Sequence, residues 1–294
     1  MKEPIFKGAC TAIVTPFSGD TIDFERLGKQ LDFQAAGGTK AIVAAGTTGE
    51  SATLSQREYD RLLAFSARHI AGQMKLIAGI GGNDTVECME KAAMAESAGA
   101  DALLLSTPYY NKTTQAGLVE HFSYVADRTR LPLILYNIPS RTGIAITAET
   151  YAALARHPNI NGIKEASGDF SLIARVAAEC AGQLNLWSGN DDQTVPMMAL
   201  GAQGVISVAS NLIPEKLSRL CQLCLSGDYA EAAARYREIA QLCRLLFVET
   251  NPIPIKAAMA LCGLDSGELR LPLVQMSEGN HGALKEELAQ LKLI

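Results

Sequence analysis

Short apolar segments recur along the chain, and each is followed by a turn rich in Gly, Thr, Ser or Asn and then by a stretch whose apolar residues have helical spacing. This alternation predicts parallel strands connected by helices. The eight predicted strands are Ala9–Thr15, Ala41–Ala45, Leu76–Ile80, Ala102–Ser106, Leu133–Asn137, Asn161–Ala166, Leu184–Ser188 and Gly204–Ala209. The predicted helices are centred near Leu31, Leu63, Ala92, Val119, Ala152, Val176, Met198 and Leu220.

The predicted strands are too apolar to have a solvated face, which favours a closed barrel over an open sheet. No Gly-x-Gly-x-x-Gly motif follows the first strand, so a dinucleotide-binding fold lacks its usual support. The glycine cluster from Gly79 to Gly82 is interpreted as a tight turn after a strand. The sequence therefore predicts an α/β fold, a (β/α)8 TIM barrel over residues 1–226.

The chain continues beyond the eighth unit, with further helical patterns at Asp228–Val248, Ile255–Leu261 and His281–Leu291. The first of these has apolar residues on one side at helical spacing. We therefore expect a C-terminal helical region over residues 227–294, added to the catalytic barrel.

Composition narrows the class of protein. With 294 residues and 48% hydrophobic content, the chain is able to bury a full core. A net charge of -5 and the absence of any Lys/Arg run argue against nucleic acid as a partner. No signal-like apolar segment opens the chain, and no run of about 18 apolar residues occurs. We expect a cytoplasmic protein that acts on small molecules, without a membrane partner.

The seven cysteines are scattered, which is typical of reduced thiols rather than a disulfide framework. Cys221 and Cys224 form a single Cys-x-x-Cys inside an apolar helical run, with no second ligand pair for zinc. They are interpreted as packed core thiols, and no metal site is expected.

Lys164 is the first candidate for chemistry. It lies in the predicted strand Asn161–Ala166, where alternation puts Ile163 and Glu165 on one face and Lys164 on the other. If Ile163 faces the helices, Lys164 faces the barrel lumen, where burial favours the neutral amine, a nucleophile towards ketones. The alternative is a lysine that pairs with Glu165 or extends from the strand end into solvent.

Tyr136 ends the preceding strand. Adjacent barrel strands end side by side at the carboxyl face, where the active sites of this fold lie, so Tyr136 and Lys164 can approach each other. A phenol there could relay protons, although a tyrosine at a strand end often serves packing alone.

Thr47 and Thr48 lie in the glycine-flanked loop Gly46–Ser51, after the second strand. Hydroxyls and backbone N–H groups in such a turn suit a carboxylate, and an ordinary turn would not need two threonines. Arg141 follows Tyr136 and is suited to bidentate capture of a second carboxylate, unless it is simply a solvated surface charge.

Four motifs together resemble the dihydrodipicolinate synthase family of pyruvate-dependent aldolases, and the likeness runs from Ala12 to Lys256. The motifs are Gly46-Thr47-Thr48-Gly49-Glu50-Ser51, Thr107-Pro108-Tyr109-Tyr110-Asn111-Lys112, Tyr136-Asn137-Ile138-Pro139-Ser140-Arg141-Thr142-Gly143 and Gly162-Ile163-Lys164-Glu165-Ala166. Each motif is weak alone, but four in the family's order are specific.

The resemblance implies that Lys164 forms a Schiff base with pyruvate. The resulting enamine would add to aspartate semialdehyde, and cyclisation would give 4-hydroxy-tetrahydrodipicolinate for diaminopimelate and lysine biosynthesis. It also implies that Tyr136 relays protons and is hydrogen-bonded to Thr48 and to Tyr110 of a neighbouring subunit. Enzymes of this family use no cofactor and are usually tetramers built as a dimer of dimers.

The resemblance assigns substrate contacts as well. Thr47 and Thr48 would hold the pyruvate carboxylate, Arg141 would hold that of the semialdehyde, and Gly189 and Ile206 would line the pocket.

The family's lysine feedback site is matched at Ser51, Ala52, Asn83, Glu87 and Tyr109. It departs at Gln56 and Tyr59, where lysine-sensitive members often carry histidine. The sequence therefore predicts weak sensitivity to lysine.

Two other functions remain open. N-acetylneuraminate lyase and the ketodeoxy-sugar-acid aldolases are similar in Lys164, Tyr136 and the Gly-x-Thr-Gly-Glu loop, but Arg141 and the paired threonines favour the synthase. A non-catalytic barrel that binds a keto acid or an amino acid is the second alternative, because fold alone does not fix function.

Overall fold

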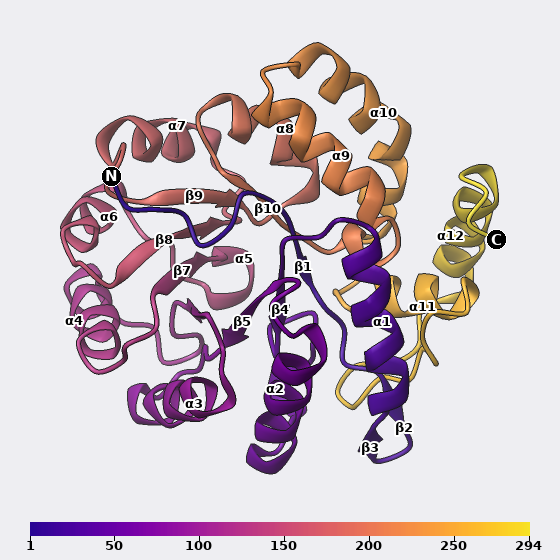
Figure 1. Cartoon of the computed structure of the whole chain (residues 1–294), viewed down its shortest axis with the longest axis horizontal. Helices are drawn as coiled ribbons and strands as arrows, with labels where there is room; N and C mark the ends of the chain where they lie inside the picture. The colour runs from indigo at the N-terminus through magenta and orange to yellow at the C-terminus, as the bar shows by residue number, and fades with distance from the viewer.

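Eight parallel strands close into a barrel in the computed structural model, which describes residues 1–294 (Figure 1). Around the barrel the strand order is β1-β10-β9-β8-β7-β6-β5-β4. The strands are β1 (Gly8–Ala12), β4 (Ala41–Ala44), β5 (Lys75–Gly79), β6 (Ala102–Ser106), β7 (Leu133–Asn137), β8 (Ile160–Glu165), β9 (Asn185–Ser188) and β10 (Gly204–Ser207). The predicted (β/α)8 barrel is confirmed, and every predicted strand overlaps an observed one.

Helices on the outside of the barrel connect the strands (Figure 1). They are α1 (Phe24–Ala36), α2 (Gln56–Ile70), α3 (Thr85–Ala98), α4 (Gln115–Ala126), α5 (Pro139–Thr142), α6 (Ala148–Ala155), α7 (Phe170–Glu179), α8 (Thr194–Ala199) and α9 (Pro214–Leu225). Three short 3-10 turns are η1 (Ser51–Thr53), η2 (Asp191–Gln193) and η3 (Ala209–Asn211). Ser55 starts α2 with a capping box, in which its side chain accepts from the Glu58 backbone N and the Glu58 side chain accepts from the Ser55 backbone N.

The first strand is shorter than predicted. Ile13 N still donates to Val43 O at 3.1 Å, but Val14 N donates to the Asn211 side chain at 3.3 Å instead of to a neighbouring strand. Pairing therefore ends before Thr15, although the sequence stays apolar and β-branched. The chain then forms a small hairpin, β2 (Phe17–Ser18) with β3 (Thr21–Ile22), that the sequence pattern did not predict.

Alternation along each strand divides the core in two. One group of 13 buried residues fills the barrel, and a larger group of 69 packs between the strands and the helices. The inner group includes Ile134 and Tyr136 of β7, while Ile163 of β8 belongs to the outer group. Lys164 therefore faces the lumen, as the alternation predicted.

The amino-terminal end of the lumen is closed by two aromatic rings. Phe6 and Trp187 stack with centroids 4.9 Å apart, and Trp187 Nε1 donates to Phe6 O at 3.3 Å. Trp187 also fills the space beside Gly162, since a Cβ there would lie 2.6 Å from the indole ring. Both rings are buried.

The three predicted C-terminal helices are present as α10 (Tyr229–Leu245), α11 (Ile253–Leu261) and α12 (Glu278–Gln290). Helix α10 packs on α8 and α9, and α12 packs on α10 and α11. Figure 1 shows these orange and yellow helices along one side of the barrel. The predicted boundary at residues 226 and 227 falls in the loop between α9 and α10. Of all the helices, none is long and apolar enough to span a membrane.

Candidate active site

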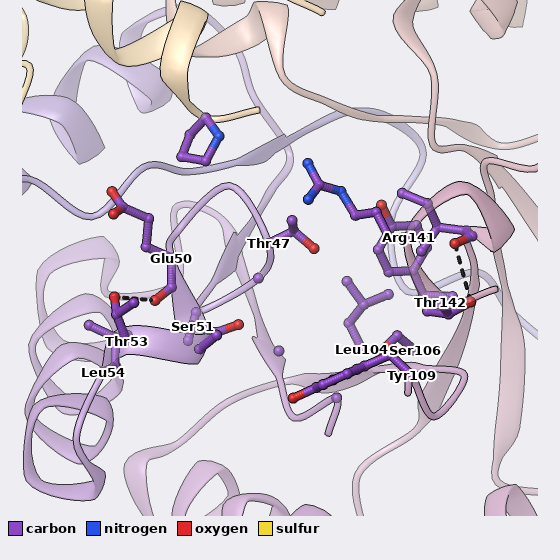
Figure 2. A pocket seen from close by; sticks show the side chains of 18 of the residues that line it. Thr47, Glu50, Ser51, Thr53, Leu54, Leu104, Ser106, Tyr109, Arg141 and Thr142 are labelled. Carbon is purple, nitrogen blue, oxygen red and sulfur yellow. Dashed lines mark hydrogen bonds between the residues drawn. The ribbon is translucent and has the colours of Figure 1, made fainter. Parts of the chain in front are cut away.

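A cavity of about 360 Å³ opens at the carboxyl ends of the strands (Figure 2). Its wall combines the loop after β4, the ends of β6 and β7, and segments of the C-terminal region. The lining includes Gly46, Thr47, Glu50, Ser51, Leu104, Ser106, Tyr109, Tyr136, Arg141, Asn251, Pro252, Pro272 and Leu273.

Lys164 does not itself line this cavity, but it lies against Tyr136, which does. Its amine is 4.2 Å from the centroid of the Tyr136 ring, and the two residues are register partners on adjacent strands. Lys164 is 5% exposed and makes neither a hydrogen bond nor an ion pair. Burial is the main cause that lowers the pKa of Lys164 from 10.5 to about 8, and the Arg141 charge adds to it.

The alternative in which Lys164 pairs with Glu165 is wrong. Glu165 lies on the opposite face of β8, where it accepts hydrogen bonds from Asn137 Nδ2 at 3.0 and 3.1 Å and from Tyr151 OH at 2.8 Å. Ser167 N donates to the same carboxylate at 2.7 Å. Glu165 is therefore satisfied by α6 and the strand ends, and the Lys164 amine stays unpaired.

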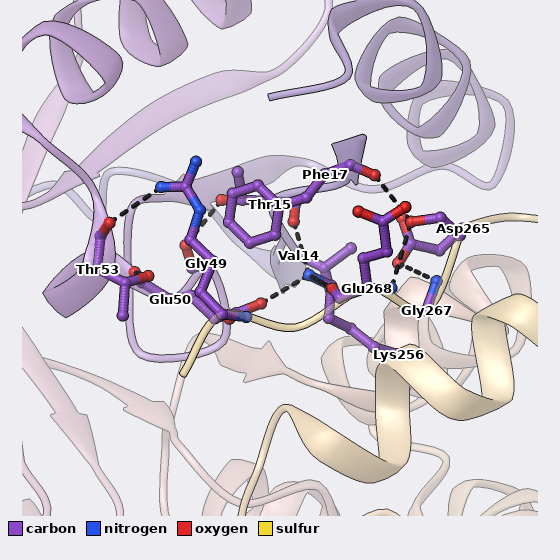
Figure 3. Close-up of polar contacts among 12 residues, drawn as sticks. Val14, Thr15, Phe17, Gly49, Glu50, Thr53, Lys256, Asp265, Gly267 and Glu268 are labelled. Atoms are coloured by element: carbon purple, nitrogen blue, oxygen red, sulfur yellow. Dashed lines mark hydrogen bonds and ion pairs between the residues drawn. The ribbon is translucent and has the colours of Figure 1, made fainter. Parts of the chain in front are cut away.

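A second lysine, Lys256 on α11, is also fully buried, and it differs from Lys164 in its partners. Its amine donates to Glu50 Oε1 at 2.6 Å, Thr15 O at 2.9 Å and Glu268 O at 2.6 Å (Figure 3). Three acceptors, one of them a carboxylate, stabilise the charged form of Lys256. Only Lys164 combines burial with a free amine, so it is the candidate nucleophile.

Burial raises the pKa of the Tyr136 phenol, which keeps it protonated at neutral pH. The expected hydrogen bond between Tyr136 and Thr48 does not occur in this structure. Thr48 Oγ1 instead accepts from Asn251 Nδ2 at 3.0 Å. Because this bond uses the oxygen as an acceptor, the Thr48 hydroxyl proton stays available for donation.

Thr47 and Arg141 both line the cavity, as the labelled side chains in Figure 2 show. Arg141 lies in α5, four residues after Asn137 at the end of β7, and its Nη2 donates to Asn251 O at 2.8 Å. One hydrogen bond thereby holds the guanidinium beside the cavity, and Arg141 as a whole is exposed to solvent.

Neither Gly189 nor Ile206 lines the main cavity. A Cβ at Gly189 would lie 3.2 Å from Lys164 Cε and 2.7 Å from Ala166 Cβ, so the absence of a side chain there leaves room for the lysine stem. Ile206 is fully buried in the inner core group. Gly189 therefore makes room for Lys164, whereas Ile206 is part of the packed lumen.

Tyr110 is not brought into the site of its own chain. Its side chain is 90% exposed, and its backbone φ of 64° lies in the left-handed region. Tyr109, its neighbour, lines the outer part of the cavity.

The residues matched to the family's lysine site divide into two groups. Ser51, Ala52, Glu87 and Tyr109 line the outer part of the cavity, whereas Asn83 uses its backbone O to accept from Asn111 Nδ2 at 2.8 Å.

The two positions that depart from the lysine-sensitive pattern do not line this cavity. Gln56 donates to Glu90 at 3.2 Å, and Tyr59 is buried with a hydroxyl that has no partner.

Sequence reasoning missed the contribution of the C-terminal region to the cavity. Asn251 holds both Thr48 and Arg141, and Pro252, Pro272 and Leu273 form part of the wall. The Asn251-Pro252-Ile253-Pro254 stretch lies outside the four motifs that carry the resemblance. A buried polar residue before a proline at a helix start was the available signal.

The fold and the site together define a (β/α)8-barrel protein with a buried, unpaired lysine at the carboxyl ends of its strands. The family model described as the dihydrodipicolinate synthetase family matches residues 5–291. A 4-hydroxy-tetrahydrodipicolinate synthase from Thermoanaerobacter sp. (strain X514) is 46% identical over 99% of this chain and 98% of its own.

Solved structures of dihydrodipicolinate synthases are also similar to this chain. A dihydrodipicolinate synthase from Acinetobacter baumannii, complexed with pyruvate, superposes with a TM-score of 0.96 at 40% identity over 98% of this chain and 100% of its own. A monomeric dihydrodipicolinate synthase variant gives 0.97 at 39% identity over 99% and 98%. The chain belongs to the dihydrodipicolinate synthetase family.

Proposed function

We propose that this protein condenses pyruvate with aspartate 4-semialdehyde, through a Schiff base on Lys164, to give 4-hydroxy-tetrahydrodipicolinate. The observation that carries the proposal is a buried lysine amine without a partner, 4.2 Å from the centroid of a buried tyrosine ring. Its pKa of about 8 leaves roughly a tenth of the amine neutral near pH 7, about 300-fold more than at a pKa of 10.5.

In the proposed reaction, Lys164 Nζ bonds to C2 of pyruvate and the keto oxygen leaves as water. Loss of a methyl proton converts the imine into an enamine, whose carbon bonds to the aldehyde carbon of the second substrate. The amino group of that substrate then attacks the imine carbon, which closes the ring and releases Lys164. Tyr136, protonated and adjacent to the amine, is the group placed to donate and take back the proton in these steps.

Thr47 and Thr48 are proposed to hold the pyruvate carboxylate, and Arg141 that of the semialdehyde. Arg141 supports this role because Asn251 O fixes it at the cavity mouth, where its remaining N–H groups are available to an incoming carboxylate. This fixed arginine also favours the synthase over the sialic-acid and ketodeoxy-sugar-acid aldolases.

We also propose that the active form is a cytoplasmic homotetramer in which Tyr110 reaches the site of a neighbouring subunit. The 90% exposure of Tyr110 in the single chain and its held left-handed backbone support such a contact. Seven free cysteines, six of them buried, suit a reducing compartment.

Borohydride trapping tests the nucleophile. Reduction in the presence of pyruvate should leave one covalent adduct on Lys164, located by peptide mass spectrometry. Lys164→Ala should fold normally and lose at least about three orders of magnitude in rate, because the covalent route is removed. An unmodified protein would instead support the non-catalytic binding barrel.

A substrate comparison tests the reaction. The protein should turn over pyruvate with aspartate semialdehyde in a coupled assay, and it should act far less on sialic acid or ketodeoxygluconate. A preference for either sugar acid would replace the synthase by a rival aldolase.

A further inference from the structure

The turn that carries Thr47 and Thr48 ends in a strained residue. Glu50 has a backbone φ of 53°, in the left-handed region that non-glycine residues rarely adopt. Such a conformation is strained and persists only where the surroundings hold it. The contacts of Glu50 show what holds it here.

Both carboxylate oxygens of Glu50 are engaged. Oε1 accepts from Lys256 Nζ at 2.6 Å, and Oε2 accepts from Arg270 N at 3.0 Å. The preceding residue is held as well, because Thr15 Oγ1 donates to Gly49 O at 2.7 Å and Thr15 O accepts from Lys256 at 2.9 Å. We call Thr15, Glu50 and Lys256 the turn clamp, and Figure 3 draws these residues among the polar contacts around Lys256.

Burial of the charged groups of the turn clamp costs free energy. The Lys256 side chain is 0% and the Glu50 side chain 1% exposed. Desolvation of two charges largely offsets their attraction, so a buried ion pair adds little net stability compared with apolar residues of similar volume. The location of the ion pair explains its presence better than stability does, because Glu50 lies in the same turn as Thr47 and Thr48.

The start of α11 supplies two of the contacts to this turn. Asn251 Nδ2 donates to Thr48 Oγ1, and Lys256, five residues later, binds Glu50. The two contacts fix the turn on both sides of Gly49. A rotation of Glu50 out of its left-handed conformation would therefore displace Thr47, which lines the cavity, and Thr48 beside it.

We propose that the turn clamp positions Thr47 and Thr48 for the carboxylate of the keto acid, which makes Glu50 and Lys256 positioning residues for the reaction. The inference rests on the proposed function, since it assumes that pyruvate binds at this turn. Lys256 acts through Glu50 and the turn, not as a second nucleophile.

The test measures borohydride trapping of Lys164 as a function of pyruvate concentration. Glu50→Gln keeps the shape of the side chain but removes its charge, and it should raise the half-saturating pyruvate concentration about tenfold, the effect of losing a charged hydrogen bond. The trapping rate at saturating pyruvate and its pH midpoint should stay unchanged, because the surroundings of Lys164 are intact. Thr15→Val removes one neutral bond and should raise the concentration about threefold.

Glu58→Gln is the matched control. Glu58 pairs with the Arg270 guanidinium at 2.5 Å, whereas Arg270 binds Glu50 through its backbone N, so this change removes no bond made by Thr15, Glu50 or Lys256. The same carboxylate-to-amide change there should leave the half-saturating concentration unchanged even if it lowers the melting temperature.

The possible results separate the two proposals. If the wild-type protein forms no adduct with pyruvate, the proposed function fails. If the wild type is trapped and Glu50→Gln has the same half-saturating concentration, the positioning role is overturned, whatever happens to stability. Should Glu50→Gln not fold, Thr15→Val decides, and an unchanged concentration in that variant overturns the inference.

Discussion

Replacement of Lys164 by methionine should stabilise the protein while abolishing its chemistry. Folding lowers the pKa of Lys164 from 10.5 to about 8, so the folded chain binds this proton less tightly than the unfolded chain. Near pH 7 that difference opposes folding by about 3 kcal/mol. Methionine has a similar volume and carries no charge, so Lys164→Met should gain up to this amount.

The difference in stability between Lys164→Met and wild type should depend on pH, in a direction that follows from the lowered pKa. Wild-type stability should rise as the pH increases from about 8 to 10.5, because the unfolded chain still binds a proton that the folded chain has released. Lys164→Met lacks this group, so its advantage should shrink to about 1 kcal/mol near pH 9.5 and vanish above about pH 10.5.

Urea unfolding at equal protein concentrations, followed by the fluorescence of the single tryptophan, measures the difference. Lys256→Met is the matched comparison. It leaves the Glu50 carboxylate buried without its partner and should cost about 3–5 kcal/mol. The reasoning is refuted if Lys164→Met is less stable than wild type near pH 7, or if its gain does not change with pH.

Three further predictions concern the site. Asn251→Ala should lower kcat/KM about fivefold in initial-rate assays, because the Thr48 hydroxyl loses a donor; unchanged kinetics would show that this bond does not matter. Tyr110→Phe should lower turnover while sedimentation velocity shows an unchanged oligomer, and full turnover would argue against a role for the phenol across an interface. Initial rates should respond only weakly to lysine, given Gln56 and Tyr59, and inhibition by micromolar lysine would contradict this.

The strands could be predicted well where both faces of the sheet are buried. The strands β6 and β7 match the predicted ranges Ala102–Ser106 and Leu133–Asn137 to the residue, because there the apolar run and the hydrogen-bonded ladder coincide. The first strand was overextended because Val14 is bound by Asn211, 197 residues away, and no local pattern encodes that bond.

In the site, too, local patterns could be predicted from the sequence, whereas contacts between distant residues could not. Alternation within one strand was sufficient to place Lys164 in the lumen, and strand adjacency was sufficient to bring Tyr136 beside it. The bond from Asn251 to Thr48 spans 203 residues and the pair of Lys256 with Glu50 spans 206. Such contacts depend on how the C-terminal region packs on the barrel, which periodicity does not describe.

The stacked rings of Phe6 and Trp187 close the lumen at its amino-terminal end, which leaves access from the carboxyl ends of the strands. In the proposed reaction the substrates enter past Thr47 and Arg141, so the one that bonds to Lys164 would lie deeper than the second. We therefore expect pyruvate to bind first and its water to leave before the aldehyde binds. The fixed order of binding would follow from the closed amino-terminal end of the barrel.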